Sequence, residues 1–404
     1  MEAIMADLKE KSKQALMMAA DWYCNHQIRR QKPYYDANQG RFLYNYHIPS
    51  GTTVWGLQWT MARGIMVLLG AYEIEPKEKY FEAAAIAAEY LRSLQVFDNS
   101  DPRWYGAIRE EVPQVWHVDV RDLFESISGL MFMYRITRNQ DYLYRAKIAG
   151  SWALANASDR NDWPAFWFYL CEDRVDWQNK FYVGAGHCYY YLYKGTGYSL
   201  WLERGFIPLA NGLLENYFDF KKGCVIVGSD DAHHGTSGRE GESGVAVNDD
   251  GCGETLLIAY DLLKEDKWID AAVSYGDYLI QQKPTSMKAG LALRIIYLYD
   301  LARVTGESKY REWADSNIEG LLSLQITDSE DPMLQGGYLW EDEDPKHYSG
   351  GKSEEYVVGR TTAYSSIACM RAHGKITGPY YGWERWDDVE ITEIEEPRLA
   401  GYSG

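Results

Sequence analysis

A short sequence pattern occurs twice in this chain, 230 residues apart, and this repeat constrains the fold more than any other feature. Leu91–Gln95 (LRSLQ) matches Leu321–Gln325 (LLSLQ). The other matches at this interval are Asp101-Pro102 with Asp331-Pro332 and Gly106 with Gly336. Repetition of this kind is typical of a chain that stacks one structural unit several times.

The repeat continues into the segments that follow. Arg121 and Ser126 match Arg360 and Ser365 at an interval of 239, so the second copy has a longer loop. A weaker third copy is Gly238-Arg239-Glu240, which is similar to Ile108-Arg109-Glu110. In each copy a loop rich in charged residues leads into an apolar segment with helical spacing.

Apolar helices alternate with amphipathic helices along the chain. Segments 54–71, 120–138, 181–194, 249–263, 289–305 and 359–377 are apolar on nearly every side, whereas 7–30, 78–95, 141–156, 198–218, 267–282 and 308–325 are expected to have a polar face. Helices of the first kind are buried and those of the second kind lie outside. The sequence therefore predicts an all-α (α/α)6 toroid of one domain, residues 1–404, in which the N-terminal helix pairs with the last inner helix and closes the ring.

The connections differ in length in a regular way. Turns from an inner to an outer helix are tight, whereas 33–53, 96–119, 156–180, 219–248 and 326–358 form long loops. We expect these long loops to converge over the N-terminal ends of the inner helices. Minor β-strands are expected within them, for example at Cys224–Val227.

Charge and cysteine usage exclude several classes of function. The net charge of −18 argues against binding to nucleic acid or to an anionic membrane surface. No apolar run reaches the length of a membrane span. The six cysteines lack a CxxC pair and indicate reduced thiols in a cytoplasmic protein, whose substrate would be a small molecule.

Carboxylates gather before two of the inner helices. The candidate catalytic residues are Glu110, Asp119 and Asp122 in the first group and Glu240, Asp249 and Asp250 in the second. Hydrolysis of a glycosidic bond requires two positioned carboxyl groups, one of them with a raised pKa. The structural alternative is that an aspartate at a helix start only caps the helix.

Arginines occur near the same helix starts. Arg109, Arg121, Arg239 and Arg360 are candidates for binding a substrate carboxylate, because a guanidinium holds a carboxylate through two parallel hydrogen bonds. This pattern favours a uronic acid. The alternative is that each arginine forms a salt bridge with a neighbouring acid.

Aromatic and histidine side chains complete the expected site. The candidates for contact with a sugar are Trp55, Trp59, Trp116, His117, His233, His234 and Tyr338. His187 fits a hydrogen-bonded core histidine. The histidines show no spacing typical of a metal site, and neither a Walker loop nor a Rossmann fingerprint is present. We therefore expect no metal or other cofactor.

Taken together, the chain resembles the six-hairpin carbohydrate enzymes, especially the unsaturated glucuronyl hydrolases and related β-glucuronidases. The resemblance is strongest at Gly106–Gln114 (GAIREEVPQ), Asp119–Ser126 (DVRDLFES) and Asn248–Glu254 (NDDGCGE). It implies catalytic acids near inner-helix starts, at Asp119 or Asp122 and at Asp249 or Asp250, with Glu110 and Glu240 as loop candidates.

The resulting prediction is a glycoside hydrolase that releases a terminal uronic acid, as β-glucuronide or unsaturated glucuronide, from an oligosaccharide. One alternative is a uronate lyase or epimerase that removes the C5 proton with a tyrosine or histidine, from Tyr105, His117, His233, His234 and Tyr338. The other is a sugar-binding protein without catalysis. The acidic segment Trp386–Pro397 is a candidate interface for a homo-oligomer.

Overall fold

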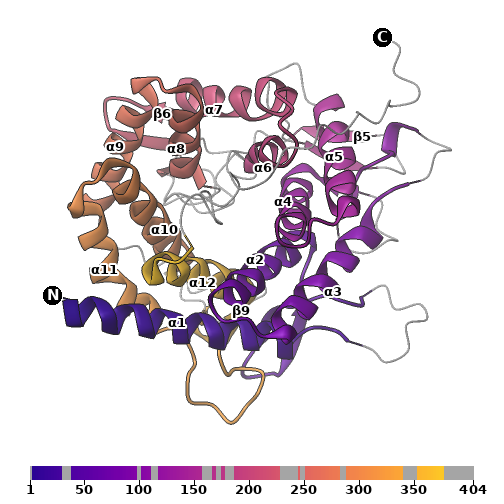
Figure 1. The fold of residues 1–404 in the computed structure, drawn as a ribbon. Coiled ribbons are helices and arrows are strands. Elements are labelled where there is room, and N and C mark those ends of the chain that lie inside the picture. Colours follow the sequence, from indigo (N-terminus) through magenta and orange to yellow (C-terminus); the bar gives the residue numbers. More distant parts are fainter. Residues whose placement is uncertain are drawn as a thin grey trace.

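In the computed structural model the chain forms a ring of helices (Figure 1). The residues that the structure describes are 2–29, 38–97, 102–110, 117–156, 166–169, 174–177, 186–227, 244–245, 251–282, 288–339 and 353–376. Within these ranges, no helix is both long and apolar enough to span a membrane.

The helices form two concentric layers. The inner helices are α2 (Gln58–Ile74), α4 (Val120–Thr137), α6 (His187–Thr196), α8 (Cys252–Leu263), α10 (Lys288–Thr305) and α12 (Gly359–His373). The outer helices are α1 (Glu2–Asn25), α3 (Glu78–Leu94), α5 (Gln140–Ala155), α7 (Ile207–Gly212), α9 (Asp266–Gln281) and α11 (Ser308–Leu322). The predicted (α/α)6 toroid is confirmed.

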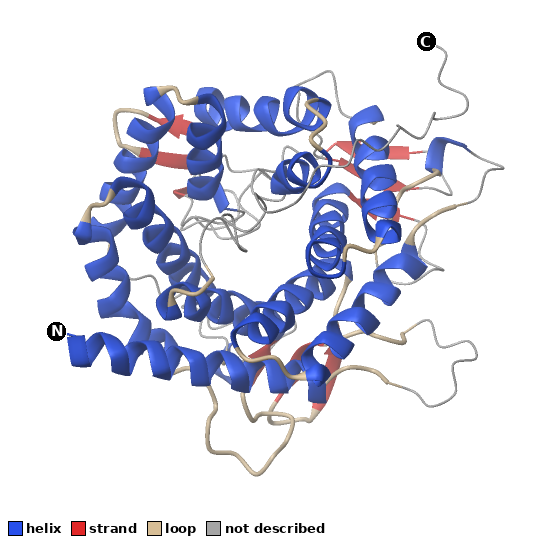
Figure 2. Cartoon of the chain, in the orientation of Figure 1, coloured by secondary structure: helices blue, strands red, loops and turns tan. Residues whose placement is uncertain are grey.

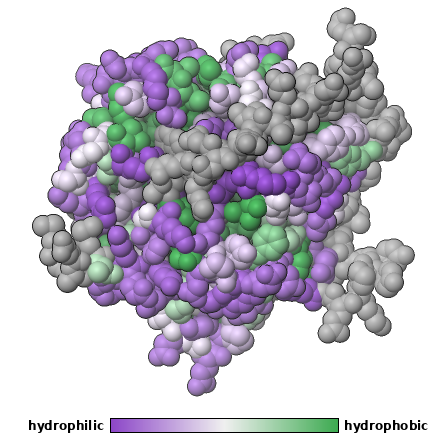
Figure 3. All heavy atoms as spheres, viewed as in Figure 1, coloured by the Kyte–Doolittle hydropathy of each residue, from purple (hydrophilic) through white to green (hydrophobic). Residues whose placement is uncertain are grey.

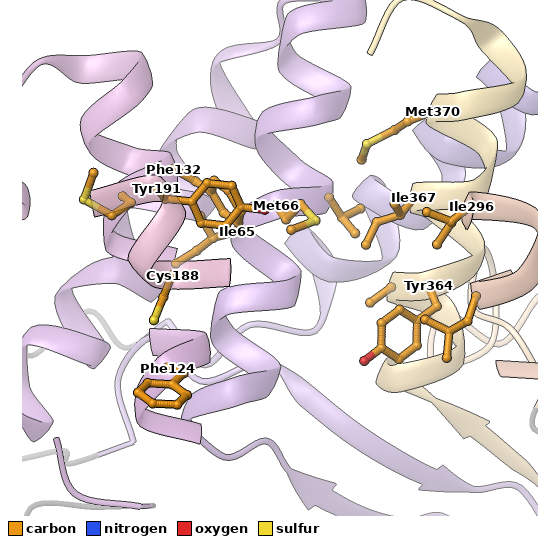
Figure 4. Close-up of a cluster of buried hydrophobic side chains, with 14 of the residues drawn as sticks. Ile65, Met66, Phe124, Phe132, Cys188, Tyr191, Ile296, Tyr364, Ile367 and Met370 are labelled. Atoms are coloured by element: carbon orange, nitrogen blue, oxygen red, sulfur yellow. The ribbon is translucent and has the colours of Figure 1, made fainter. Parts of the chain in front are cut away.

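The difference between the layers follows from the sequence. All residues of α4 from Val120 to Arg135 are buried, whereas α11 buries only a stripe at helical spacing, namely Tyr310, Ala314, Ile318 and Leu321. The inner helices pack against one another through apolar side chains, as Figure 4 shows for residues from α2, α4, α6, α10 and α12. Among the described residues, the face of the ring seen in Figure 3 is mainly hydrophilic, with smaller hydrophobic patches.

The N-terminal helix closes the ring. Helix α1 packs along α12 and also contacts α2 and α3, as Figure 1 shows. The Tyr23 hydroxyl of α1 donates a hydrogen bond to the carbonyl oxygen of Gly359, the first residue of α12, over 2.8 Å. This bond and the packing of α1 along α12 join the two helices.

In the described part of the chain, three small sheets lie among the long connections (Figure 2). Their antiparallel orders are β2-β1-β9, β3-β4-β5 and β6-β7-β8. The strands are β1 (Leu43–His47), β2 (Thr52–Trp55), β3 (His117–Asp119), β4 (Phe166–Tyr169), β5 (Arg174–Trp177), β6 (Phe218–Asp219), β7 (Cys224–Val227), β8 (Gly244–Val245) and β9 (Tyr356–Val358). The strand expected at Cys224–Val227 is confirmed. Strands β2, β3 and β9 lead closely into α2, α4 and α12, so the sheets fix where these inner helices begin.

The bounds of several helices differ from the sequence prediction, and two of these differences have a clear physical reason. The helix expected from residue 54 begins at Gln58, because Thr52–Trp55 pairs with β1 instead. The helix expected over 198–218 is divided into π-helical Trp201–Phe206, α7 and π-helical Leu213–Tyr217. Pro208 lies in the first turn of α7, where it lacks the N–H needed to continue the preceding hydrogen-bond ladder.

The sequence repeat corresponds to a contact between neighbouring outer helices that we call the glutamine latch. In it, the side-chain amide of a glutamine after one outer helix donates hydrogen bonds to a glycine carbonyl oxygen in the following loop and to a carbonyl oxygen of the next outer helix. The Gln95 side-chain amide donates to the carbonyl oxygens of Gly106 (3.2 Å) and Arg145 (3.0 Å). Its repeat partner Gln325 donates in the same way to Gly336 (3.0 Å) and Ala15 (2.8 Å). The repeat therefore links α3 to α5 and α11 to α1.

The structure reveals a further copy that the sequence comparison did not find. The Gln27 amide donates to the carbonyl oxygens of Gly40 (3.1 Å) and Ala83 (2.9 Å), which links the end of α1 to α3. Gly40, Gly106 and Gly336 all have positive φ angles, between 90° and 100°. The proposed copy at Gly238-Arg239-Glu240 lies outside the described residues.

Buried ion pairs tie the inner helices together at their C-terminal ends. Arg135 of α4 pairs with Glu73 of α2, and Arg371 of α12 pairs with Asp300 of α10 over 3.0 Å. Side chains of the second pair are only 1% exposed. The long connections and sheets lie at the opposite, N-terminal ends, which is where polar side chains gather.

Candidate functional site

Polar and charged side chains are buried at the N-terminal ends of the inner helices. They are Gln58 (α2), Asp122 (α4), His187 (α6), Glu254 and Thr255 (α8), all of them 4% exposed or less. Such residues cost free energy to bury unless each finds a partner. The polar groups at the C-terminal ends are ion pairs between neighbouring inner helices, whereas the N-terminal ends gather carboxyl, amide, hydroxyl and imidazole groups beside the long connections, which marks this end as the candidate active site.

Three of the predicted carboxylates meet at the start of α4. Glu110, Asp119 and Asp122 are 5%, 6% and 4% exposed. Asp119 caps α4 by accepting a hydrogen bond from the Arg121 N–H at its Oδ1 atom, over 2.9 Å. The Glu110 N–H donates to the carbonyl oxygen of His117 over 3.1 Å, so strand β3 holds the Glu110 loop against the helix start.

Helix α2 supplies the support for Glu110. The Gln58 side-chain amide donates to Glu110 Oε2 over 2.9 Å, and the Gln58 backbone N–H donates to the Glu110 carbonyl oxygen over 3.3 Å. The Ser126 hydroxyl of α4 lies 3.1 Å from Gln58 Oε1 and 2.9 Å from the carbonyl oxygen of Asp122. Gln58 was not singled out in the sequence, where the only signal is a polar residue at the start of an apolar helix.

The carboxyl groups perturb one another strongly. Burial, and next the charge of Asp119, raise the pKa of Glu110 to about 7, against hydrogen bonds from Asp122 and Gln58 that lower it. Burial, together with Glu110 and Asp119, raises the pKa of Asp122 well above its usual value, and Arg121 opposes this rise. Because two close carboxylates in an apolar setting do not both ionise readily, Glu110 and Asp122 hold at least one proton at neutral pH.

A second charged group lies between α2, α4 and α12. Arg63 and Glu125, each 4% exposed, form an ion pair. The Arg63 guanidinium lies 5.4 Å from the ring centre of Tyr364, and that of Arg360 lies 5.7 Å from the same ring. Burial raises the pKa of Tyr364, while the positive charges of the arginines oppose this rise.

The predicted arginines are only partly brought together. Arg360 lies over the Tyr364 ring together with Arg63, and the charge of Arg121 also lowers the pKa of Tyr364. Arg109 belongs to the latch loop, where its N–H donates to the Leu94 carbonyl oxygen over 3.1 Å. Arg63 and Glu125 were not among the residues singled out from the sequence. The sequence alone does not distinguish a buried charged residue in an apolar helix from an exposed charged residue.

His187 joins α6 to α8. Its Nε2 atom lies 2.8 Å from the Thr255 hydroxyl, which donates in turn to the Gly251 carbonyl oxygen over 3.0 Å. Since that hydroxyl has one proton, His187 Nε2 is the donor. Burial, and then the charge of Arg63, lower the pKa of His187 to about 3, so the ring is neutral and a weak base.

The predicted aromatic residues lie in different environments. Trp55 of β2 and Trp59 in the first turn of α2 are half-buried, and Trp59 meets the Tyr44 ring edge-on at a centroid distance of 5.5 Å. His117 of β3 is half-buried as well. Tyr338 is fully buried, and its hydroxyl contacts Cys369 Sγ over 3.9 Å. The candidates outside the described residues are Trp116, His233, His234, Arg239, Glu240, Asp249 and Asp250.

No protein-family model matches the sequence, and no curated protein matches it either. Solved structures do match the fold. A sugar epimerase from a ruminal bacterium is 13% identical with a TM-score of 0.67, and the match covers 90% of this chain and 98% of the epimerase. The chain shares the six-hairpin (α/α)6 toroid fold.

Two glycoside hydrolases have the same fold. An unsaturated glucuronyl hydrolase specific for heparin is 15% identical with a TM-score of 0.61, covering 90% of this chain and 97% of that enzyme. An α-1,6-mannanase of Salegentibacter, in an inactive variant with two adjacent aspartates replaced, is 13% identical with a TM-score of 0.56, covering 91% and 98%. At these identities the likeness establishes the architecture alone.

Proposed function

We propose that this protein is a glycoside hydrolase that releases a terminal uronic acid from an oligosaccharide. The proposal rests on the buried pair Glu110 and Asp122, which retains a proton at neutral pH. A carboxylic acid with a pKa of about 7 can donate its proton to a leaving oxygen and still be recharged from water at neutral pH. A purely structural role in the core does not require two carboxyl groups close together in space at the start of one helix.

The reaction needs this acid and one further carboxylate. The protonated acid gives its proton to the glycosidic oxygen as the bond from the sugar C1 to that oxygen breaks. Water adds to C1 and loses a proton to the second carboxylate, for which Asp249, Asp250 and Glu240 remain the candidates.

The arginines support a substrate with a carboxylate. Arg121 and Arg360 stand at the second residue of α4 and of α12, and both act on Tyr364. Guanidinium groups at one end of the ring would hold a uronate against the overall negative charge of the protein. The named activity of the unsaturated glucuronyl hydrolase with the same fold agrees with this choice. We further propose a small oligosaccharide substrate in the cytoplasm.

A sugar epimerase is the second candidate, and the similar fold of the ruminal enzyme is the observation that favours it. An epimerase that acts at a carbon next to a carbonyl or carboxylate needs a base to remove a proton. His187 is a weak base, because its pKa is about 3, and the expected candidates for this base are Tyr105, His117, His233, His234 and Tyr338. We place the hydrolase first because the buried acid pair at the start of α4 suits proton donation to a leaving oxygen.

The test is a substrate panel of aryl β-glucuronide, aryl β-glucoside and an unsaturated uronyl disaccharide. We expect phenol release from the glucuronide, or loss of absorbance from the unsaturated ring, and no release from the glucoside. Glu110→Gln should lower kcat/KM by about 100- to 10,000-fold. Glu312→Gln, on the exposed surface of α11, is the matched control and should leave the rate unchanged. New ultraviolet absorbance from an intact uronate oligosaccharide would indicate a lyase, and isomerised sugar without hydrolysis would indicate an epimerase.

A further inference from the structure

We infer that Ser50 is a nucleophilic serine, activated by His47 and Glu355, that accepts an acyl group from a small activated ester. These three residues, which we call the hairpin triad, lie at the tip of the β1–β2 hairpin and in the turn before β9. The inference is independent of the proposed function, because the triad shares no residue with the carboxyl groups at the start of α4.

Backbone pairing places Glu355 beside His47. His47 is the last residue of β1, and Tyr356 of β9 lies directly opposite it. The Ile48 N–H donates to the Glu355 carbonyl oxygen over 2.8 Å. The imidazole packs against the buried Tyr356 ring at a centroid distance of 4.6 Å, and its Nε2 atom lies 3.5 Å from Glu355 Oε2. The ring is thus held with a carboxylate on its Nε2 side.

The turn after β1 brings Ser50 to the other nitrogen of the ring. Gly51 has a φ of +67°, and its N–H closes the turn by donating to the His47 carbonyl oxygen over 2.9 Å. Ser50 Oγ lies 2.6 Å from His47 Nδ1 and 2.8 Å from Thr52 Oγ1. A hydroxyl on one imidazole nitrogen and a carboxylate near the other allow a histidine to act as a general base on the hydroxyl.

The protons along these contacts can be assigned without conflict. Glu355 favours the tautomer of neutral His47 that has its proton on Nε2, because this proton then faces the carboxylate. Nδ1 is therefore an acceptor, and Ser50 donates its single proton to it. The Thr52 hydroxyl donates its own proton to Ser50 Oγ. When Nδ1 takes the Ser50 proton, the imidazolium forms beside the Glu355 carboxylate, whose charge stabilises it.

Ser50 is accessible to a substrate. It is exposed, and its backbone N–H has no hydrogen-bond partner among the described residues, so this N–H can donate to an oxyanion. Rotation of the exposed Thr52 hydroxyl frees a lone pair of Ser50 Oγ for attack.

The reaction is an acyl transfer. Ser50 Oγ bonds to the acyl carbon, the ester C–O bond breaks, and the proton passes from Ser50 through His47 to the leaving oxygen. A single backbone N–H stabilises an oxyanion less than two donors do. We therefore expect aryl esters and thioesters, which have good leaving groups, to react and amides not to react.

Labelling of the whole protein with an alkyl fluorophosphonate tests the nucleophile. The reagent forms an Oγ–P bond and releases fluoride, while His47 takes the Ser50 proton. Fragmentation of the labelled peptides should place the adduct at Ser50, formed at least about 100-fold faster than an adduct at Ser316. Ser316 is the matched control, because it is exposed and its hydroxyl donates to the Trp313 carbonyl oxygen over 2.8 Å and not to a histidine. Similar rates at the two serines would mean that the hydrogen bonds of Ser50 only shape the hairpin, and would overturn the inference.

Variants test the two supporting residues. His47→Gln removes the base and should slow the labelling of Ser50 by about 100- to 10,000-fold. Glu355→Gln should slow it by about ten-fold, as expected for the loss of one charge at a partly exposed site. Glu312→Gln, on the exposed surface of α11, should leave the rate unchanged. An unchanged rate in both His47→Gln and Glu355→Gln, with the circular dichroism spectrum retained, would refute the activation.

The acyl transfer itself is measured with p-nitrophenyl acetate. We expect a burst of p-nitrophenolate stoichiometric with the protein, together with a mass increase of one acetyl group that maps to Ser50. Ser50→Ala should abolish both the burst and the acetylated peptide. A burst of the same size in Ser50→Ala would show that other groups react with the ester, and the inference would fail.

Discussion

The side-chain amide of Gln95, at the end of α3, donates a hydrogen bond to the backbone carbonyl oxygen of Arg145 in the middle of α5, 3.0 Å away. The same contact joins Gln325 to Ala15 and Gln27 to Ala83. Each latch connects one outer helix to the next around the ring. Outer helices otherwise touch mainly their own inner partners, so we expect the latches to set the spacing of the outer layer.

Loss of a latch should destabilise the protein. Gln95→Ala and Gln325→Ala each remove the side-chain donor to two backbone carbonyl oxygens, buried in every case except that of Arg145, so we expect the free energy of unfolding to fall by about 1–3 kcal/mol. Urea unfolding followed by circular dichroism measures the change. Gln14→Ala on the exposed face of α1 should change the free energy by less than about 0.5 kcal/mol. Equal effects at the two kinds of position would exclude a stabilising latch.

The glycines of the latches should tolerate no side chain. A Cβ atom on Gly106 would lie 2.8 Å from the Ile148 carbonyl oxygen, and the residue has a φ of +100°. Gly374 also has a positive φ, +82°, but nothing lies within 4 Å of its Cβ position. We therefore expect Gly374→Ala to cost about 1 kcal/mol and Gly106→Ala clearly more, because the second adds a clash to the strain. Thermal unfolding of the two variants compares their stabilities directly. Equal losses of stability would mean that the backbone of α5 moves away from the added Cβ atom at little cost in free energy.

The buried ion pair at the C-terminal ends of α10 and α12 should be sensitive to loss of one charge. Asp300→Asn removes the charge that the buried Arg371 guanidinium pairs with over 3.0 Å, so we expect a loss of about 3–5 kcal/mol. Asp261→Asn breaks the exposed pair with Lys264 and should cost no more than about 1 kcal/mol. Denaturant midpoints of the two variants provide the measurement. A small loss for Asp300→Asn would mean that water or another acid reaches Arg371.

Stability should fall with rising pH because of Glu110. Its pKa is raised in the folded state, from 4.5 to about 7, so the folded state binds more protons than the unfolded state between these values. The free energy of unfolding then decreases as pH rises through this window, by an amount on the order of 3 kcal/mol, and Asp122 acts in the same direction. Urea unfolding at pH 5.5 and pH 8 measures the slope.

The substitution Glu110→Gln removes this titration. The variant should therefore be more stable than the unaltered protein at pH 8, even though it loses the proposed activity. The two proteins should differ less at pH 5.5, where Glu110 is already protonated. A steeper loss of stability with pH in Glu110→Gln would contradict the raised pKa.

The sequence was sufficient for the architecture because the architecture depends on local patterns. Helix α4 is buried on all sides, whereas α11 is buried along one stripe only. This difference is visible in the spacing of apolar residues within each helix, without knowledge of the rest of the chain. The 230-residue repeat likewise reflects one latch geometry built twice, at Gln95 and at Gln325. The copy at Gln27 escaped detection because only the glutamine, the glycine and the backbone carbonyls are shared, and carbonyls leave no trace in a sequence.

The candidate site is only partly readable from the sequence. Glu110, Asp119 and Asp122 are close in the chain, so their common location at the start of α4 could be predicted. Gln58, 52 residues away from Glu110, reaches the same point only because α2 and α4 are neighbours in the ring. The pKa of Glu110 and the environment of Arg63 depend on burial and on charges from other helices. The sequence by itself determined most of the helical segments and which helices lie inside. Only the tertiary structure decided which acid is desolvated and which hydrogen-bond donors it meets. The reason is that electrostatic and hydrogen-bond energies depend on distances between segments far apart in the chain.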